Sequence, residues 1–230
     1  MVLACARRIV RYDGAVRHGD WRLATGMPMF RVRGRVLGIV GFGKIGQTVA
    51  RKATALGLLC IAFDPYVADA VFREHGVEAT SLDELLARAD FVTLHVPLTG
   101  ETRHMFDAER LADLKPTAFL VNTSRGGVID QDTLVAALRQ GQLAGAALDV
   151  FEPERLADGH PLLALPNVIA TPHVAFYSEE SVRDLALLGA RNVAAILAGR
   201  RPASLVNPEV LALPRWAHLQ PALAPSARLG

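Results

Sequence analysis

The sequence is poor in cysteine, in net charge and in long apolar runs. Only two of its 230 residues are cysteines, and neither Cys5 nor Cys60 has the spacing of a metal or redox motif. Cys60 lies in a run expected to form a buried strand, so a reducing cytoplasm is the simplest setting, and no metal site is predicted. The net charge is only +2, with Lys and Arg scattered, which argues against a nucleic-acid groove. No apolar run reaches the length of a membrane span.

What the sequence does contain is a regular alternation of short apolar runs and helical patterns. Near-continuous apolar strands that alternate with helices are typical of a parallel sheet covered on both faces. The fold class predicted is therefore α/β, a doubly wound parallel sheet. Six strands are expected at 36–40, 58–63, 91–94, 118–121, 145–148 and 168–170. Helices are expected at 47–56, 68–75, 82–89, 108–114 and 131–140, with Ser81 and Asp130 as N-caps.

Two segments flank the predicted dinucleotide-binding domain at 36–177. Residues 1–35 are expected to begin with a short amphipathic helix and to continue as an irregular arm around Trp21. Residues 178–210 are expected to hold a long helix with Ser178 as its N-cap. Residues 211–230, with three prolines, are predicted to form a mobile tail.

A glycine motif follows the first predicted strand. Gly41-Phe42-Gly43-Lys44-Ile45-Gly46 stands between that strand and a helix, and the second strand ends in Asp64, 18 residues after Gly46. In a dinucleotide fold these glycines allow a tight turn, close approach of a pyrophosphate and close helix packing, while the acid binds the ribose. A carboxylate repels a 2′-phosphate, so NAD is favoured over NADP. The alternative is that the glycines only close a turn.

Chemically useful side chains follow the later strands. Arg125 comes after the fourth predicted strand, Glu154 after the fifth and His173 after the sixth. Because ligands bind outside the carboxyl ends of such strands, these groups are expected at one rim. A guanidinium binds a carboxylate and a carbonyl, a His moves a proton, and a carboxylate orients that His. Glu152 competes with Glu154 for this last role, and His95, after the third strand, is equally well a supporting or a plain strand-end residue.

These motifs resemble the D-isomer-specific 2-hydroxyacid dehydrogenases. The resemblance is carried by segments 41–46, 63–66, 95–99, 122–127, 147–154 and 171–173. Segment 174–181 looks closest to the branch that includes the C-terminal-binding proteins. The resemblance implies an NAD-binding Rossmann fold and interconversion of a D-2-hydroxy acid and a 2-oxo acid. A Gln stands at the position of Glu154 in the related formate dehydrogenases, which argues against formate as substrate.

The resemblance also implies a role for each residue that matches the family's motifs. Arg125 would bind the substrate, His173 would be the general acid and base, and Glu154 its partner. Asp149 would meet the nicotinamide carboxamide and Asp64 the adenosine ribose. The residues expected to line the pyrophosphate and the rest of the cofactor cleft are Gly41, Gly43, Lys44, Ile45, Gly46, Val96, Pro97, Thr102, Thr123, Ser124, Arg125, His173 and Ala175. Arg155 departs from the family's usual Pro, with a small expected effect.

The resemblance covers one of the family's two lobes. A substrate-facing lobe of roughly 100 residues would normally precede the first helix, and here that helix begins almost at Met1. We therefore expect an NAD-dependent dehydrogenase in truncated form, or alternatively a catalytically silent NAD-binding dimeric module or regulator; a remnant without function is a third reading. In the family the segment corresponding to 1–35 forms a two-fold interface, so a homodimer is predicted. If the partner lobe is missing, Val2, Leu3 and Ile9 are expected to be exposed.

Overall fold

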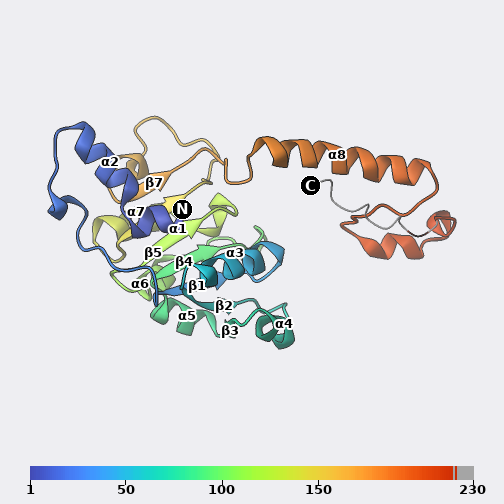
Figure 1. The fold of residues 1–230 in the computed structure, drawn as a ribbon, viewed down its shortest axis with the longest axis horizontal. Helices are drawn as coiled ribbons and strands as arrows, with labels where there is room; N and C mark the ends of the chain where they lie inside the picture. Colours follow the sequence, from blue (N-terminus) through green and yellow to red (C-terminus); the bar gives the residue numbers. More distant parts are fainter. Residues whose placement is uncertain (220, 222–230) are drawn as a thin grey trace. The chain divides into compact units, whose positions relative to one another are not determined.

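The apolar runs form one parallel sheet. The structure is a computed structural model that describes residues 1–219 and 221. Within those residues the sheet has seven strands: β1 (Val36–Val40), β2 (Leu59–Phe63), β3 (Glu78–Ala79), β4 (Phe91–Leu94), β5 (Phe119–Asn122), β6 (Gly145–Leu148) and β7 (Val168–Ala170). Their order is β3-β2-β1-β4-β5-β6-β7, with every pairing parallel (Figure 1). The predicted α/β fold class is confirmed.

The six predicted strands agree with the structure to within one residue at each end. The seventh, β3, was missed because its two exposed residues do not form an apolar run; it pairs with β2 at the edge of the sheet. The expected burial of Cys60 is wrong in degree. Leu59 is exposed and Cys60 half-buried, because β3 is too short to extend the sheet beside that end of β2.

Helices connect the strands and flank the sheet: α1 (Val2–Ala6), α2 (Ile9–Arg17), α3 (Lys44–Ala55), α4 (Asp69–Glu74), α5 (Leu82–Arg88), α6 (Ala108–Ala112), α7 (Gln131–Arg139) and α8 (Glu179–Leu197). The predicted N-caps are confirmed. Ser81 accepts a hydrogen bond from Glu84 N, Asp130 from Asp132 N and Thr133 N, and Ser178 from Ser181 N. Each side chain thereby satisfies backbone donors that have no partner inside the helix.

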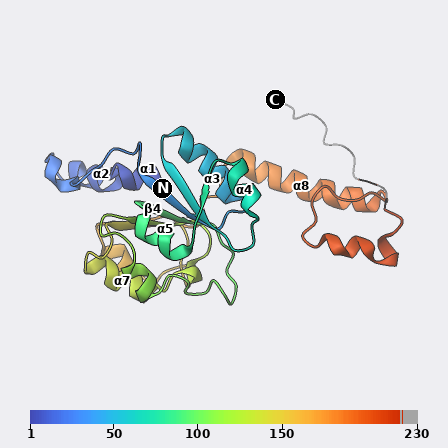
Figure 2. The ribbon, with the colours of Figure 1, turned by 90° about the horizontal axis from the view of Figure 1, so that it is seen from below.

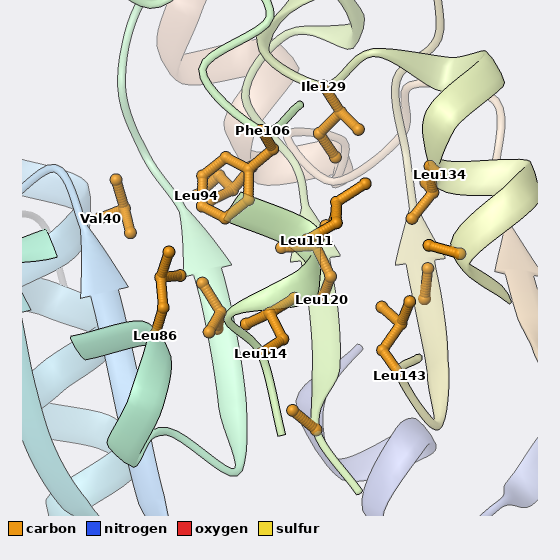
Figure 3. Close-up of a cluster of buried hydrophobic side chains, with 14 of the residues drawn as sticks. Val40, Leu86, Leu94, Phe106, Leu111, Leu114, Leu120, Ile129, Leu134 and Leu143 are labelled. Carbon is orange, nitrogen blue, oxygen red and sulfur yellow. The ribbon is translucent and has the colours of Figure 1, made fainter. Parts of the chain in front are cut away.

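Two buried layers, one on each face, hold the sheet. The layer in Figure 3 packs α5, α6 and α7 on the sheet through Leu86, Leu111, Leu134 and their neighbours. The opposite layer includes Cys5 of α1, Ala50 of α3 and Phe72 of α4. Figure 2 shows α5 and α7 on one side of the sheet and α1, α3 and α4 on the other. Because both faces are covered, the loops at the strand ends are left to form sites.

The N-terminal segment consists of two short helices and a 3-10 turn. α1 and α2 are separated at Arg8, whose backbone is left-handed with φ 50°. A 3-10 helix, Leu23–Gly26, follows in the arm. Leu3 and Ile9 are 45% and 55% exposed, as expected, whereas Val2 packs against the buried layer that contains Cys5.

The chain divides into two compact units, Met1–Ala175 and Phe176–Gly230. The first contains the whole sheet. The second contains α8 and two 3-10 helices, Pro208–Ala212 and Pro214–Trp216. Residues 211–216 of the predicted mobile tail form 3-10 turns, where proline at the first positions favours the helical backbone, and their mobility stays a prediction. Residues 220 and 222–230 of that predicted tail lie outside the described residues.

Candidate active site

The residues singled out in the sequence follow consecutive strands along one edge of the sheet. Asp64 follows β2, Gly41 follows β1, His95 follows β4, Thr123 follows β5 and Asp149 follows β6. Thr171 to His173 follow β7 at the end of the row. Strand order reverses between β1 and β4, and the crevice at such a reversal is where open α/β sheets bind ligands. The topology thus places the glycine loop beside this crevice.

The three glycines of the loop have three different surroundings. Gly41 has φ +93°, and an added Cβ would lie 2.8 Å from the carbonyl carbon of His95. A Cβ on Gly46 would lie 2.2 Å from the carbonyl oxygen of Gly41, so this glycine lets α3 start close to β1. A Cβ on Gly43 would meet no atom within 4 Å. Gly43 therefore faces open space, which fits the predicted approach of a pyrophosphate.

Lys44 and Ile45 form the exposed first turn of α3, directly after Gly43. The first N–H groups of a helix have no partner inside it, and the helix dipole favours an anion there. Lys44 adds a positive charge to the same turn. The loop and the helix start together fit the phosphates of a dinucleotide.

The side chain of Asp64 is partly exposed and also forms a hydrogen bond with the glycine loop. Its carboxylate accepts hydrogen bonds from Phe42 N at 2.8 Å and from Tyr66 N at 3.0 Å. Tyr66 is 78% exposed, and its hydroxyl donates to Glu101, so the loop after β2 is tied to the loop after β4. This hydrogen bond raises the pKa of Tyr66. The predicted ribose acid is therefore also a structural residue of the loop.

The other residues predicted for the cofactor cleft lie in the loops after β4 and β5. Thr102 Oγ1 donates to the carbonyl of Pro97 at 2.6 Å and accepts from Thr99 N at 2.8 Å, which fixes the turn that follows Val96. Val96 and Thr123 are half-buried, and Pro97 is exposed. The loop after β4 lies beside the reversal of strand order, and the loop after β5 is one strand further along the sheet.

His95 is held in its neutral form. Burial lowers its pKa to about 4, and its Nε2 lies 3.0 Å from the hydroxyl of Thr93. Its backbone N–H donates to Val40 at 2.7 Å, which ties the end of β4 to the end of β1. Both contacts are made within β4 and to its neighbour β1, so the two readings given by the sequence stay predictions.

Arg125 is exposed, and the side chain of Asn122 forms a hydrogen bond with its backbone. The buried Asn122 donates through Nδ2 to the carbonyl of Arg125 at 2.9 Å and accepts from Ser124 N at 3.0 Å. The Arg125 guanidinium donates to the carbonyl of Ser124 at 2.6 Å. An added Cβ on Gly126 would lie 2.0 Å from the carbonyl of Phe151, so the turn packs closely on the loop after β6.

Asp149, which follows β6, is buried and hydrogen-bonded to the loop after β7. It is 0% exposed, and its carboxylate accepts hydrogen bonds from the hydroxyl of Thr171, from Val174 N at 3.0 Å and from Ala175 N at 2.8 Å. The expected contact with a nicotinamide carboxamide stays a prediction, and a carboxylate with three donors keeps acceptor capacity for a further one. Through these three hydrogen bonds Asp149 clamps the loop that carries His173.

His173 and Glu154 are brought together across 19 residues. Nδ1 of His173 is hydrogen-bonded to the Glu154 carboxylate. The His173 backbone is left-handed, with φ 54°, and its N–H donates to the carbonyl of Asp149 at 2.7 Å. The backbone bond to Asp149 fixes the position of His173 in the loop, and the bond to Glu154 orients its imidazole through Nδ1.

Glu152, the competitor of Glu154, has other partners. It forms an ion pair with Arg103 at 2.8 Å, Nε2 of His104 lies 3.5 Å from its carboxylate, and the hydrogen bond from Arg103 lowers its pKa. Its backbone N–H donates to Gln131 Oε1 at 3.1 Å. Glu154 and its exposed neighbour Arg155 instead line a cavity of about 450 Å³ together with Phe151, Leu156, Leu163, Ala170, Thr171, Pro172 and His173.

Sequence reasoning missed the residues that support the loops. Asn122 and Thr171 hold Arg125 and Asp149, and Phe42 links the glycine loop to Asp64. A buried Asn at the end of an apolar strand is a usable signal, because a buried amide needs hydrogen-bond partners. The Phe42 link acts through a backbone N–H and leaves no signal in the side chains.

Comparison with known proteins decides the family. A family model described as D-isomer specific 2-hydroxyacid dehydrogenase, NAD binding domain, matches residues 1–175, more than half of the chain. The chain belongs to this family. NAD is the cofactor of this domain, in agreement with the sequence. The placement near the C-terminal-binding-protein branch stays a prediction.

Relatives and solved structures of this family match most of the chain. A glyoxylate reductase from Korarchaeum cryptofilum is 46% identical over 92% of this chain and 64% of its own length. A glycerate dehydrogenase from Methylorubrum extorquens is 40% identical over 87% of this chain and 63% of its own length. The NAD-complexed D-isomer specific 2-hydroxyacid dehydrogenase of Lactobacillus delbrueckii is 31% identical, with a TM-score of 0.82 over 90% of this chain and 66% of that one. The chain thus spans slightly less than two thirds of these relatives.

Two kinds of feature are absent from the part of the chain that the structure describes. Among residues 1–219 and 221, no group of three or more His, Cys, Asp or Glu side chains could hold a metal ion. In the same residues, no helix combines the length and the apolar character that a membrane crossing requires.

Proposed function

We propose that this chain is the cofactor-binding and proton-transferring part of an NAD-dependent D-2-hydroxyacid dehydrogenase. The observation that carries the proposal is the His173–Glu154 pair, which lies on the same edge of the sheet as a glycine loop with an open face at Gly43. The reaction is the interconversion of a 2-hydroxy acid and a 2-oxo acid. When bound, NAD supplies or accepts the hydride.

The chain's own residues divide the remaining tasks. The exposed guanidinium of Arg125 binds the substrate carboxylate and polarises its carbonyl, since its planar donors suit both oxygens. His173 gives a proton from Nε2 to the carbonyl oxygen during reduction and takes it back during oxidation. Glu154 accepts from Nδ1 of His173, which fixes the tautomer and stabilises the charged imidazole. The Asp149 clamp keeps the imidazole in place.

Cofactor binding follows the same edge. Gly43, Lys44 and Ile45 hold the pyrophosphate, and Asp64 accepts hydrogen bonds from the adenosine ribose, which favours NAD over NADP. The nicotinamide end lies near the loops after β5, β6 and β7. The residues proposed to line the cleft are Val96, Pro97, Thr102, Thr123, Ser124, Arg125, His173 and Ala175.

The substrate, the assembly and the location are parts of the same proposal. Names of the relatives point to glyoxylate and glycerate as the first acids to test. We propose a cytoplasmic homodimer formed through residues 1–35, because α2 and the arm expose Ile9, Val10, Val16 and Trp21. Apolar side chains gathered on a helix and an adjoining arm are typical of a surface that another chain covers. Residues 36–177 would bind the dinucleotide, and 178–210 would extend towards a substrate-facing lobe.

The test measures binding and turnover separately. NADH binding is followed by fluorescence titration, and turnover of glyoxylate, hydroxypyruvate and pyruvate by the loss of NADH absorbance. We expect His173→Asn to lower kcat by about 10²–10⁴-fold, because general acid–base catalysis contributes that much, and to weaken NADH binding far less. Glu154→Gln should lower kcat less and shift its pH profile, and Glu152→Gln serves as the matched control that changes neither.

Each outcome separates the dehydrogenase from its alternative. Turnover that falls in His173→Asn supports the enzyme. Tight NADH binding with no turnover of any of the three acids, by this chain or by the chain joined to a substrate-facing lobe, would establish a silent NAD-binding module instead. Absence of NADH binding would contradict both.

A further inference from the structure

A second cavity lies at the opposite edge of the sheet, away from the candidate active site. It has a volume of about 560 Å³, within the range of about 300–1,000 Å³ that is usual for small-molecule sites. Several of its lining residues stand just before the first residue of a strand: Arg35 before β1, Asp90 before β4, Ala144 before β6 and Asn167 before β7. The cavity therefore opens at the amino ends of the strands, and the proposed dehydrogenase chemistry does not use it.

The charge that lines this cavity is unbalanced. Four arginines, Arg8, Arg11, Arg35 and Arg139, face one acid, Asp90. Asp90 is itself already engaged: it accepts from Val36 N at 2.8 Å and pairs with Lys115 at 3.3 Å and with Arg35 at 3.5 Å.

Three of the four guanidiniums are left without an acid. Within residues 1–219 and 221, no carboxylate comes within 4.0 Å of the guanidinium nitrogens of Arg8, Arg11 or Arg139. A net positive lining of this kind attracts an anion from solution.

Arg8 is held in place before any ligand arrives. Its guanidinium lies over the ring of Phe119, with Cζ 4.4 Å from the centroid, and Nη1 donates to the carbonyl of Ala144 at 3.2 Å. Burial lowers its pKa, and the nearby charge of Arg11 lowers it further. An anion bound between a half-buried arginine and a second arginine reduces the repulsion between their two positive charges.

The rest of the lining is apolar. Phe91 and Phe119 stack with ring centroids 5.8 Å apart, and Phe30 lies under the guanidinium of Arg35 at 4.4 Å. Pro28, Leu138, Leu143, Leu165 and Pro166 complete this side of the cavity. Phe91, Phe119, Leu138 and Leu143 are already buried, whereas Pro28, Phe30 and Pro166 are exposed. A ligand with an apolar body would cover these three, which a simple inorganic ion would leave in contact with water.

We propose that this cavity binds a small organic oxyanion that carries at least two negative charges on an apolar or aromatic body. Phosphate monoesters and di- or tricarboxylates share this chemistry, and guanidinium groups bind both through paired charge-assisted hydrogen bonds. The ligand would join the junction of α1 and α2, at Arg8, to the end of α7, at Arg139. The inference does not depend on the proposed dehydrogenase activity, but it requires that the proposed dimer through residues 1–35, which include Arg8, Arg11 and Arg35, leave this cavity open.

The experiment titrates the whole chain calorimetrically with phenyl phosphate, inorganic phosphate and citrate at constant ionic strength. We expect phenyl phosphate to bind more tightly than inorganic phosphate, because its ring covers the phenylalanine side of the cavity. The test variant is Arg11→Gln with Arg139→Gln, two exposed arginines that pair with no carboxylate among the residues the structure describes. It should weaken the tightest ligand by roughly tenfold or more, as expected for the loss of charge-assisted hydrogen bonds. Comparing phenyl phosphate with citrate distinguishes a phosphate ester from a polycarboxylate.

The matched control removes the same charge elsewhere. Arg31→Gln with Lys52→Gln changes two exposed cations that do not line the cavity and should leave the affinity unchanged. The same titrations with NADH present show whether an anion occupies the cofactor loop instead. Binding that is equal in both double variants, or no binding by any probe at millimolar concentration, would overturn the proposal. The proposal would also be overturned if the test variant changed the sedimentation coefficient but not the affinity for any ligand. In that case the cavity would be covered by a second copy of the chain.

Discussion

At the carboxyl ends of the strands, the candidate active-site residues come in short consecutive runs, whereas the cavity at the amino ends draws on residues scattered along the chain. The glycine loop occupies six neighbouring positions, and His173 follows its strand after two residues. The arginines of the second cavity come from residues 8, 11, 35 and 139. A parallel sheet places both sets reliably, but only the first leaves a motif in the sequence. The following predictions test this contrast, starting with the largest expected effect.

Gly46→Ala is expected to have the largest effect. The added Cβ would lie 2.2 Å from the carbonyl oxygen of Gly41 and 3.3 Å from Cγ2 of Ile39, so α3 would have to move away from β1. We expect the free energy of unfolding in urea to fall by about 3 kcal/mol or more. Gly43→Ala is the matched control. Its Cβ meets no atom within 4 Å, so stability should stay within about 0.5 kcal/mol.

The same pair of variants separates stability from binding. In Gly43→Ala the methyl group would occupy the space proposed for the pyrophosphate, and NADH affinity should fall by roughly tenfold or more, about 1.4 kcal/mol. Equal stabilities for the two variants, or unchanged NADH binding in Gly43→Ala, would contradict the roles given to these glycines.

Asp149→Ala tests the clamp under His173. It would leave the hydroxyl of Thr171 and the N–H groups of Val174 and Ala175 without their acceptor. We expect a loss of about 2–3 kcal/mol in the free energy of unfolding, together with faster hydrogen exchange at the amides of 174 and 175. Thr171→Val removes one donor only and should cost about 1 kcal/mol. Unchanged exchange at these amides would show that the clamp does not hold the loop.

The lowered pKa of His95 predicts a loss of folding stability in mild acid. Burial lowers its pKa from 6.5 to about 4, so the folded state stays neutral in this window while the unfolded chain takes up a proton. Stability is therefore lost as pH falls from about 6.5 towards 4, and between pH 7 and pH 5 we expect roughly 2 kcal/mol from this residue. Urea unfolding of His95→Gln at both pH values should lack this contribution. A variant with the full wild-type pH dependence would assign the effect to other groups.

Asp90→Asn is expected to have the smallest effect on stability and acts at the amino ends of the strands. The side chain is only 12% exposed, and the change removes its ion pairs with Lys115 and Arg35 while keeping an acceptor for Val36 N. We expect a loss of about 1 kcal/mol on urea unfolding. Phenyl phosphate should bind more tightly, because the single acid of the cavity is gone. Glu84→Gln, in an exposed pair with Arg88, is the control for both measurements.

The fold was predictable because local signals agreed with one another. Apolar runs located six strands, and capping residues such as Ser81, Asp130 and Ser178 marked helix starts. β3 has only two exposed residues and is a strand because β2 has a free edge, which no window of sequence reveals. The turns at 208–216 were likewise hidden behind a proline-rich composition that is usual in tails.

The location of a site residue was predictable where its position in a motif already fixes its place in the fold. The end of a strand already places Asp64, Arg125 and His173 at the rim. The contacts of Asp149 with the loop after β7 were not predictable in the same way, because they join segments 25 residues apart. The arginine cavity shows a further limit, since its lining residues precede strands in turns of ordinary composition.

The hydrogen bond between Asp64 and the Phe42 amide has a consequence for changing cofactor preference. Replacing Asp64 with a neutral or basic residue, to admit a 2′-phosphate, would also remove the acceptor that shapes the glycine turn. The single carboxylate of Asp64 therefore acts on both the preference for NAD over NADP and the geometry of the glycine turn. A redesign for NADP would have to add a second acceptor for Phe42 before the charge is reversed.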